Sequence, residues 1–209
     1  GGTNTAVGSS ALLSNTTASN NTAVGYKAAL NNTTGTQNTA IGRQALTSNT
    51  TANNNVAVGY QAALNNTTGT QNNALGSSAL LNTTTGNYNN AFGQGSLYYN
   101  TSGSKNTALG DQALFSNTTA SENVGVGYQT GYSTTTGGLN TFVGRLAGYS
   151  ATTATENTFV GTASGYSMTT GSKNTILGAY NGNAGGLDIR TASNNIVLSD
   201  GDGNPRLYL

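Results

Sequence analysis

The chain contains no cysteine, no histidine and no tryptophan. Without cysteine there is neither a disulfide framework nor a thiol nucleophile. Without cysteine and histidine together, the usual zinc sites are excluded, and so are imidazole bases. The stability of the fold must therefore come from packing and hydrogen bonds.

Charge is scarce as well. Asp, Glu, Lys and Arg make up 6% of the chain and the net charge is +1, whereas ordinary soluble proteins carry roughly 25% charged residues. The seven Lys and Arg residues are scattered singly, so the electrostatic footprint of nucleic-acid binding is missing. No strongly acidic or basic partner is implied, and solubility must depend on Asn, Thr, Ser and Gly.

Long apolar runs are also missing. No segment approaches the roughly 20 residues that a membrane span needs, and no signal peptide is visible. The chain starts at Gly1 without a methionine and ends on the apolar segment 206–209. These ends predict a segment of a longer protein.

What the chain has instead is a strict repeat. An asparagine recurs every 17 residues through eleven units, and a glycine follows each one four residues later. The asparagines are Asn4, Asn21, Asn38, Asn55, Asn72, Asn89, Asn106, Asn123, Asn140, Asn157 and Asn174. The glycines are Gly8, Gly25, Gly42, Gly59, Gly76, Gly93, Gly110, Gly127, Gly144, Gly161 and Gly178. A fixed period without insertions is typical of solenoids, so the chain delivers a constant geometric step rather than a pocket.

The unit from Asn21 to Gln37 illustrates one repeat. Two short apolar clusters are separated by glycine and closed by an Asn-Thr-Thr-Gly turn, and each cluster has the length of a strand. We therefore predict an all-β fold: a parallel β-solenoid of eleven 17-residue coils over residues 1–190, with two short strands and two turns in each coil. Coils about 4.8 Å apart would make a rod of roughly 50 Å, with side-chain amides of the asparagine column linked from coil to coil. Residues 191–209 are expected to form a C-terminal strand or hairpin that leads to a missing downstream region.

The first apolar cluster of each unit predicts an oligomer. It places alanine beside a larger apolar residue, as in Ala23-Val24 and Ala91-Phe92. Neighbouring side chains of a strand point to opposite faces, so both faces need cover. The second strand of a coil covers only one of them. We expect copies of the same strand in other chains to cover the other, with the small alanine permitting close approach, and three chains as the natural closure.

Substitutions within the repeat suggest that volume is traded across one interior. Where the alanine position holds Phe142 and Phe159, a column otherwise rich in leucine holds Gly148 and Gly165. The eighth unit breaks this pattern, because Gly125 and its partner Gly131 are both small.

The unit Asn-Thr-Ala-Val-Gly resembles the head repeats of YadA-like trimeric autotransporter adhesins, which carry the motif Asn-Ser-Val-Ala-Ile-Gly. That family forms trimeric left-handed parallel β-rolls that bind host surfaces. The longer unit with its Asn-Thr-Thr-Gly turn looks still more like repeats of bacteriophage tail fibres. In such fibres an ending like residues 194–201 leads towards a trimerising, self-cleaving chaperone. The resemblance covers residues 4–209 and carries over no binding residues.

This resemblance implies a structural and adhesive protein that is not an enzyme: a homotrimeric tail-fibre segment of a virion, involved in attachment to a host cell. Its partners would be copies of itself and a cell-surface glycan or protein receptor. The alternative is the head of a bacterial surface adhesin, exposed on the cell or secreted. No cofactor is expected.

One column of the repeat supplies candidates for ligand contact. It holds Tyr26, Arg43 and Tyr60 in successive units, and later Tyr128 and Arg145. A guanidinium between two phenol rings can stack on both. These five residues are candidates for saccharide contact, and packing of a solvent-facing ladder is the alternative interpretation.

Two further patterns concern metal and catalysis. Asp200, Asp202 and Asn204 alternate like the first half of a calcium loop but lack the later glycine and glutamate. Because they lie between two apolar segments, they also fit a hairpin turn. The other carboxylates lie in different columns or distant coils, whereas a glycosidase needs a close pair. No catalytic residue is predicted.

The Asn-Thr-Thr turns leave a third function open. A monomeric solenoid with regular threonine arrays could bind ice. However, the two threonines are adjacent, so in an extended strand they would point to opposite faces. The same segments, such as Asn32-Thr33-Thr34, match the glycosylation sequon, but turn chemistry accounts for them equally well.

Overall fold

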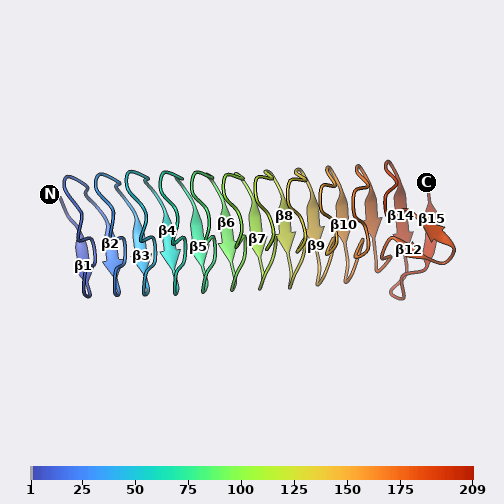
Figure 1. Ribbon diagram of the computed structural model, residues 1–209. Coiled ribbons are helices and arrows are strands. Elements are labelled where there is room, and N and C mark those ends of the chain that lie inside the picture. Colours follow the sequence, from blue (N-terminus) through green and yellow to red (C-terminus); the bar gives the residue numbers. More distant parts are fainter. Residues whose placement is uncertain (1) are drawn as a thin grey trace.

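A computed structural model describes residues 2–209 as a rod of stacked coils (Figure 1). The described residues are all-β and contain no helix. The strands of the coils are β1 (Thr5–Val7), β2 (Thr22–Val24), β3 (Thr39–Ile41), β4 (Val56–Val58), β5 (Asn73–Leu75), β6 (Asn90–Phe92), β7 (Thr107–Leu109), β8 (Val124–Val126), β9 (Thr141–Val143), β10 (Thr158–Val160) and β11 (Thr175–Leu177). At the C-terminal end follow β12 (Asn183–Ala184), β13 (Leu187–Asp188), β14 (Ile196–Ser199) and β15 (Pro205–Tyr208).

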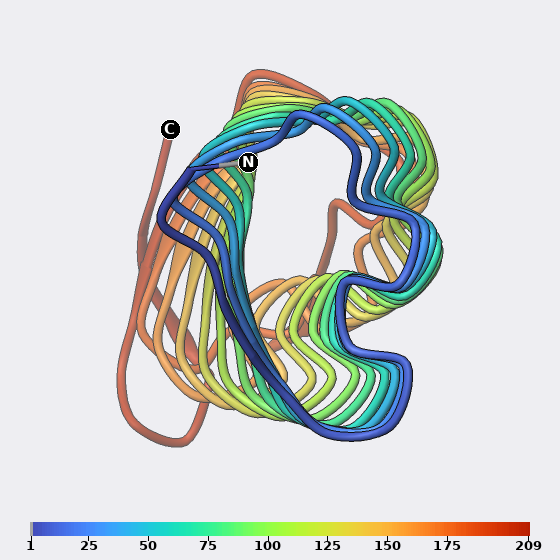
Figure 2. The same cartoon turned by 90° about the vertical axis from the view of Figure 1, so that its left-hand side faces the viewer.

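The strands of successive coils pair in parallel and in register. Thr22, Ala23 and Val24 lie opposite Thr39, Ala40 and Ile41, and the same offset continues to β11. Strand β14 adds to β11 in parallel, β15 closes the 13-stranded sheet in antiparallel orientation, and β12 pairs with β13 separately. The view along the rod shows each coil lying over the one before it with a gradual rotation (Figure 2). The predicted parallel β-solenoid is confirmed.

The prediction of a second strand in each coil is wrong. After the glycine, two residues in each of the first ten coils adopt left-handed backbone angles; in the second coil these are Lys27 (φ 57°) and Ala29 (φ 48°). Each such residue costs about 1–2 kcal/mol relative to the right-handed conformation. Backbone hydrogen bonds to both neighbouring coils offset this conformational cost, because Ala29 N donates to Ala45 O (2.9 Å) and Lys27 N donates to Ser9 O (3.0 Å). The left-handed angles also turn adjacent Ala28 and Ala29 inward together, which a strand does not allow.

The interior of each coil is half apolar and half amide. The apolar half consists mainly of small residues; in the second coil they are Ala23, Ala28 and Ala29, all at most 2% exposed. The opposite half holds the ladder of repeat asparagines, buried from Asn21 onwards. Asn38 N donates to Asn21 Oδ1 (2.9 Å), while Asn38 Nδ2 donates to Ala52 O (2.8 Å). Asparagine fits because one side chain must both accept and donate at this reach.

A second buried amide ladder was not identified from the sequence. It consists of the asparagines of the Asn-Thr-Thr turns: the half-buried Asn15 and the buried Asn32, Asn49, Asn66, Asn100 and Asn117. Thr83 interrupts this ladder, which ends at Asn117 because Thr134, Ala151 and Met168 follow in the same column. Asn49 Nδ2 donates to Asn32 Oδ1 (2.6 Å) and to Ala52 O (3.2 Å). Ala52 O therefore joins both ladders. The fully buried amides of Asn32 and Asn49 agree with turn chemistry rather than glycan acceptors.

The repeat glycines lie where coils approach most closely. Gly25 has φ +133°, and a Cβ built on it would lie 2.6 Å from the carbonyl oxygen of Gly42 in the next coil. Both the angle and the contact exclude a side chain. The glycine column therefore sets the tight spacing between coils.

The predicted compensation between large and small residues in the interior is confirmed, and it also operates between adjacent coils. A Cβ on Gly148 would lie 2.8 Å from the ring of Phe142. In the eighth coil, a Cβ on Gly131 would meet Leu114 Cδ2 from the coil before at 2.7 Å and Phe142 Cδ2 from the coil after at 2.9 Å. Gly125 likewise faces Leu114 Cγ at 2.9 Å. The two small residues of the eighth coil make room for large neighbours above and below it.

Candidate interface and ligand-contact surfaces

The outer face of the long sheet carries an apolar column, which we call the outer stripe. Its members are Val7, Val24, Ile41, Val58, Leu75, Phe92, Leu109, Val126, Val143, Val160, Leu177 and Leu198. Seven of them are exposed, from Phe92 at 37% to Val7 at 58%, and the other five are half-buried. Successive members lie opposite each other in the strand register, as Ile41 and Val58 do. At about 4.8 Å per coil the stripe runs for roughly 50 Å.

The expected direction of the strand side chains is wrong in one respect. The sequence predicts that the small residues face other chains, but the alanines from Ala23 to Ala108 are fully buried inside the coils, and the larger residues point outward. The reason is space. Ala23, Ala28 and Ala29 share one narrow interior cluster, which leaves no room for valine or leucine from both sides.

The column beside the outer stripe on the same face is uncharged and mostly polar, with Val56, Val124 and Ile196 as its apolar members. It starts each strand, as Thr22 and Thr39 do, and changes to Asn73 and Asn90 in the middle of the rod. These two asparagines form a hydrogen bond between adjacent coils on the surface, as the buried asparagines do inside, because Asn73 Nδ2 donates to Asn90 Oδ1 (2.7 Å). Neither column of the outer face contains a charged residue, so no charge repels a second apolar surface.

The candidate ligand-contact residues form two separate groups. Arg43 Cζ lies 5.9 Å from the ring centre of Tyr26 and 5.6 Å from that of Tyr60, which confirms the predicted stacking in coils two to four. Tyr128 and Arg145 are exposed in later coils. The cation–π contacts within residues 2–209 involve Tyr26 and Tyr60 only, so Arg145 does not stack on Tyr128 as Arg43 stacks on its neighbours. The structure does not bring the five residues into one site.

A stack of aromatic rings occupies another column in the C-terminal half of the rod. Neighbouring ring centres are 5.0 to 5.1 Å apart from Tyr98 through Phe115, Tyr132 and Tyr149 to Tyr166. The rings are half-buried and are consecutive neighbours along the rod, so each coil step adds one stacked pair. Such pairs stabilise by about 0.5–1.5 kcal/mol beyond burial. The stack therefore stabilises the coils that contain it.

The candidate metal ligands lie in the turn between β14 and β15. Asp200 Oδ1 accepts hydrogen bonds from Asn204 N (2.9 Å) and Asp202 N (3.1 Å), and Oδ2 accepts one from Arg206 Nε (2.9 Å). The Asn204 amide, together with Arg206, lowers the pKa of Asp200 to about 2. The carboxylate is thus engaged by the turn and by a cation of the chain itself. Among residues 2–209, no group of three acidic side chains is placed to hold a metal ion.

The two threonines of each turn have different environments. Thr50 is half-buried and donates its hydroxyl to Thr67 O in the next coil (3.2 Å). Thr51 is exposed. The segment is a bend rather than an extended strand, so each turn presents at least one exposed hydroxyl residue; in the first and sixth coils both are exposed.

No family model, curated protein or solved structure matches this chain. Residues 2–209 contain no helix that is long and apolar enough to cross a membrane. The candidate surfaces are therefore argued from geometry and side-chain chemistry.

Proposed function

We propose that the chain is a non-enzymatic segment of a homotrimeric fibre, the shaft of a phage tail fibre that takes part in attachment to a host cell. The observation that supports this most is the outer stripe. It is long, continuous, uncharged and apolar, whereas monomeric soluble proteins rarely expose continuous apolar patches beyond a few hundred Å².

A rotation axis parallel to the rod offers the simplest cover for the stripe. Cyclic symmetry places the same residues of each copy against the axis, so that Leu75 meets Leu75 and Phe92 meets Phe92. Each half-exposed aliphatic side chain holds roughly 1 kcal/mol of burial free energy. Summed over the stripe, this is of the size needed to offset the cost of association.

The proposed role follows from the mechanics of the rod. In a repeat array each coil contacts only its neighbours, and opening one coil breaks two interfaces. Copies joined along their full length share that resistance. A threefold rod also presents three copies of any surface contact, which raises avidity for a repetitive cell surface.

The test is the mass of residues 1–209 in solution by light scattering. We expect the mass of three chains. A double variant within the stripe, Leu109→Glu with Val126→Glu, should give folded monomers, because burying two charges at the axis is costly. The matched control places the same charges on exposed turn positions, Thr119→Glu with Thr136→Glu, and should stay trimeric. A stable wild-type monomer would contradict the proposal.

The alternatives have their own readouts. Antibody labelling of virions against labelling of bacterial cells separates the tail fibre from a surface adhesin head. A glycan array with the intact rod separates an adhesive segment from a spacer. A wild-type monomer would favour the ice-binding alternative, with Thr51 and its equivalents as the candidate face, and thermal hysteresis of its solution would measure that activity.

A further inference from the structure

The regular spacing of the asparagine ladder changes once, at the C-terminal end. Asn195 continues the ladder, since Asn195 N donates to Asn174 Oδ1 (3.0 Å), but 21 residues separate the two instead of 17. The longer coil contains β12 and β13. It is held firmly: Tyr180 is fully buried and its hydroxyl donates to Leu187 O (2.9 Å), and Ile189 is 2% exposed.

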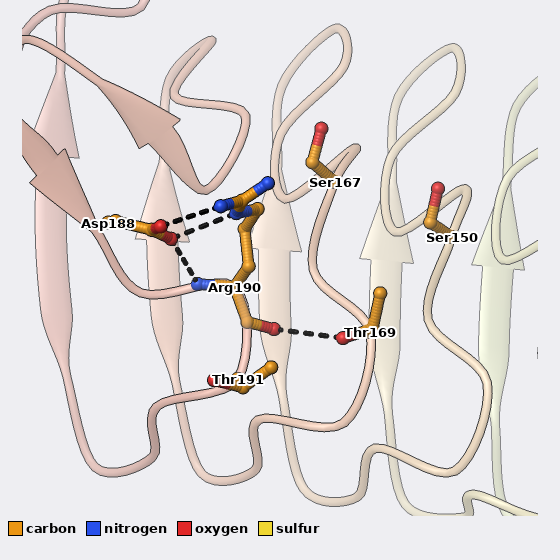
Figure 3. A pocket seen from close by; sticks show the side chains of 6 residues that line it. All are labelled: Ser150, Ser167, Thr169, Asp188, Arg190 and Thr191. Atoms are coloured by element: carbon orange, nitrogen blue, oxygen red, sulfur yellow. Dashed lines mark hydrogen bonds and ion pairs between the residues drawn. The ribbon is translucent and has the colours of Figure 1, made fainter.

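This longer coil forms one wall of a hollow of about 420 Å³. The hollow is lined by Ser150, Ser167, Thr169, Asp188, Arg190 and Thr191 (Figure 3). Ser150 and Ser167 come from consecutive coils of the regular repeat, while the longer coil supplies the charged pair. Binding pockets for small molecules begin at about 300 Å³, so the hollow has room for a ligand of the size of one or two sugar rings.

The charged pair is fixed and electrically neutral as a unit. Arg190 Nε donates to Asp188 Oδ1 (3.0 Å) and Arg190 Nη2 donates to Oδ2 (2.7 Å). The backbone N of Arg190 also donates to Oδ1 (3.2 Å), and its carbonyl oxygen accepts the Thr169 hydroxyl (3.3 Å). Two of the five guanidinium N–H groups are thus used, and three remain for a ligand. A free anion would meet the Asp188 carboxylate, and a free cation would meet Arg190.

Three of the four hydroxyl groups of the lining have no partner in the described part of the protein, the exception being the Thr169 hydroxyl. Within residues 2–209, the Oγ atoms of Ser150 and Ser167 and the Oγ1 atom of Thr191 have no hydrogen-bond partner in the protein. Each hydroxyl can both donate and accept, and the two serines repeat at the step of one coil. A ligand that pairs with this wall needs several groups that also donate and accept, at regular spacing and without net charge.

We propose that the hollow beside Arg190 is a binding site for an uncharged saccharide. Sugar hydroxyls would pair with the Ser150 and Ser167 hydroxyls and with the free guanidinium N–H groups. The lone pairs of Asp188 not used by Arg190 would accept from a further sugar hydroxyl. This site is independent of the outer stripe, since none of its residues belongs to the stripe.

The test is saturation-transfer NMR on the intact chain. The probes are glucose, galactose, N-acetylglucosamine and their disaccharides, with glucuronic acid and N-acetylneuraminic acid as charged comparisons. We expect transfer to at least one uncharged saccharide. The double variant Ser150→Val with Ser167→Val should weaken binding by about tenfold or more, which corresponds to the loss of at least one hydrogen bond.

The chain provides a matched control for this variant. Ser116 and Ser133 occupy the same column in earlier coils, are half-buried like Ser150 and Ser167, and do not line the hollow. Ser116→Val with Ser133→Val should bind like the wild type. Circular dichroism of all variants checks folding, and Arg190→Gln, an exposed substitution, should weaken binding without touching the serines.

Three results would overturn the proposal: no uncharged saccharide binds, only the acidic sugars bind, or the Ser150/Ser167 variant binds as well as its control. The mass of the same samples is measured in parallel. A monomer that binds the sugar would contradict the homotrimer and leave the site standing, whereas a trimer that binds no sugar would do the reverse.

Discussion

Thr83→Asn should stabilise the protein, because Thr83 interrupts the second amide ladder. Asn66 lies one coil before it, and its buried Oδ1 atom has no hydrogen-bond partner. On the other side, Asn100 Nδ2 reaches the Thr83 hydroxyl only at 3.3 Å. An asparagine at position 83 can donate to Asn66 Oδ1 and accept from Asn100 Nδ2, as Asn49 does between its neighbours. It can also donate to Gly86 O, just as Asn100 donates to Gly103 O (3.0 Å).

The magnitude follows from the buried acceptor. An unsatisfied buried polar atom costs about 1–3 kcal/mol. Fixing the longer side chain removes part of this gain, because ordering an asparagine costs conformational entropy. A net gain of about 1–2 kcal/mol should raise the melting temperature by roughly 2–8 °C in a chain of this size.

Thermal unfolding followed by circular dichroism measures the shift, and Thr83→Val is the matched control. Valine keeps the shape of threonine but removes the acceptor of Asn100, so it should lower the melting temperature slightly. Hydrogen exchange should show added protection of the backbone around residues 83–86 in the asparagine variant. If that variant melts at or below the wild type, the open acceptor is not a defect of the ladder and the reasoning fails.

Further predictions concern the coil spacing and two titrating groups. Gly59→Ala should lower the free energy of unfolding by several kcal/mol, since φ is +136° and a Cβ would lie 2.5 Å from a carbonyl oxygen of the next coil. Gly201→Ala, where a Cβ would meet nothing within 4 Å, is the control and should be nearly neutral. Equal melting temperatures of the two variants would refute the close-approach argument. The pKa of Asp200 lies at about 2, below its ordinary 3.8. The contribution of this carboxylate to stability is therefore present above about pH 3.8 and is lost as the pH falls through 2. Asp200→Asn should reduce the difference between the melting temperatures at pH 4 and pH 2. Burial, with Asp188 nearby, raises the pKa of Tyr180 from 10.0 to about 12, so its contribution is complete below pH 10 and is lost towards pH 12. Tyr180→Phe should cost about 1 kcal/mol at neutral pH and reduce the alkaline loss, and an unchanged alkaline profile would contradict the buried phenol.

The repeat by itself determined the architecture. In a solenoid each residue lies against its own copies, so a strict period is already a statement about three-dimensional neighbours. The parallel stack, the amide ladder of Asn38 and its equivalents, and the exchange of volume between Phe142 and Gly148 could all be predicted for that reason. The stacking of Arg43 between Tyr26 and Tyr60 followed from the same column logic.

Tertiary structure decided which way the side chains face. A strand with alanine next to valine has two apolar faces, so the sequence does not decide which face lies inside. The narrow interior shared by Ala23, Ala28 and Ala29 shows that alanine faces inward and the larger residue outward. The second cluster has the length of a strand, yet the left-handed angles at Lys27 and Ala29 turn it into a bend. Such angles at residues other than glycine depend on hydrogen bonds to adjacent coils, which a local pattern does not contain.

The same distinction holds for the candidate surfaces. The outer stripe was present in the sequence as a column, but its exposure required the fold. The hollow beside Arg190 could not be predicted from the sequence. It arises where the ladder resumes at Asn195 after a longer coil, which places Asp188 and Arg190 around the same hollow as serines from earlier coils. The 17-residue period predicts the contacts that repeat from coil to coil. Contacts that depend on the one longer coil appear only in the folded chain.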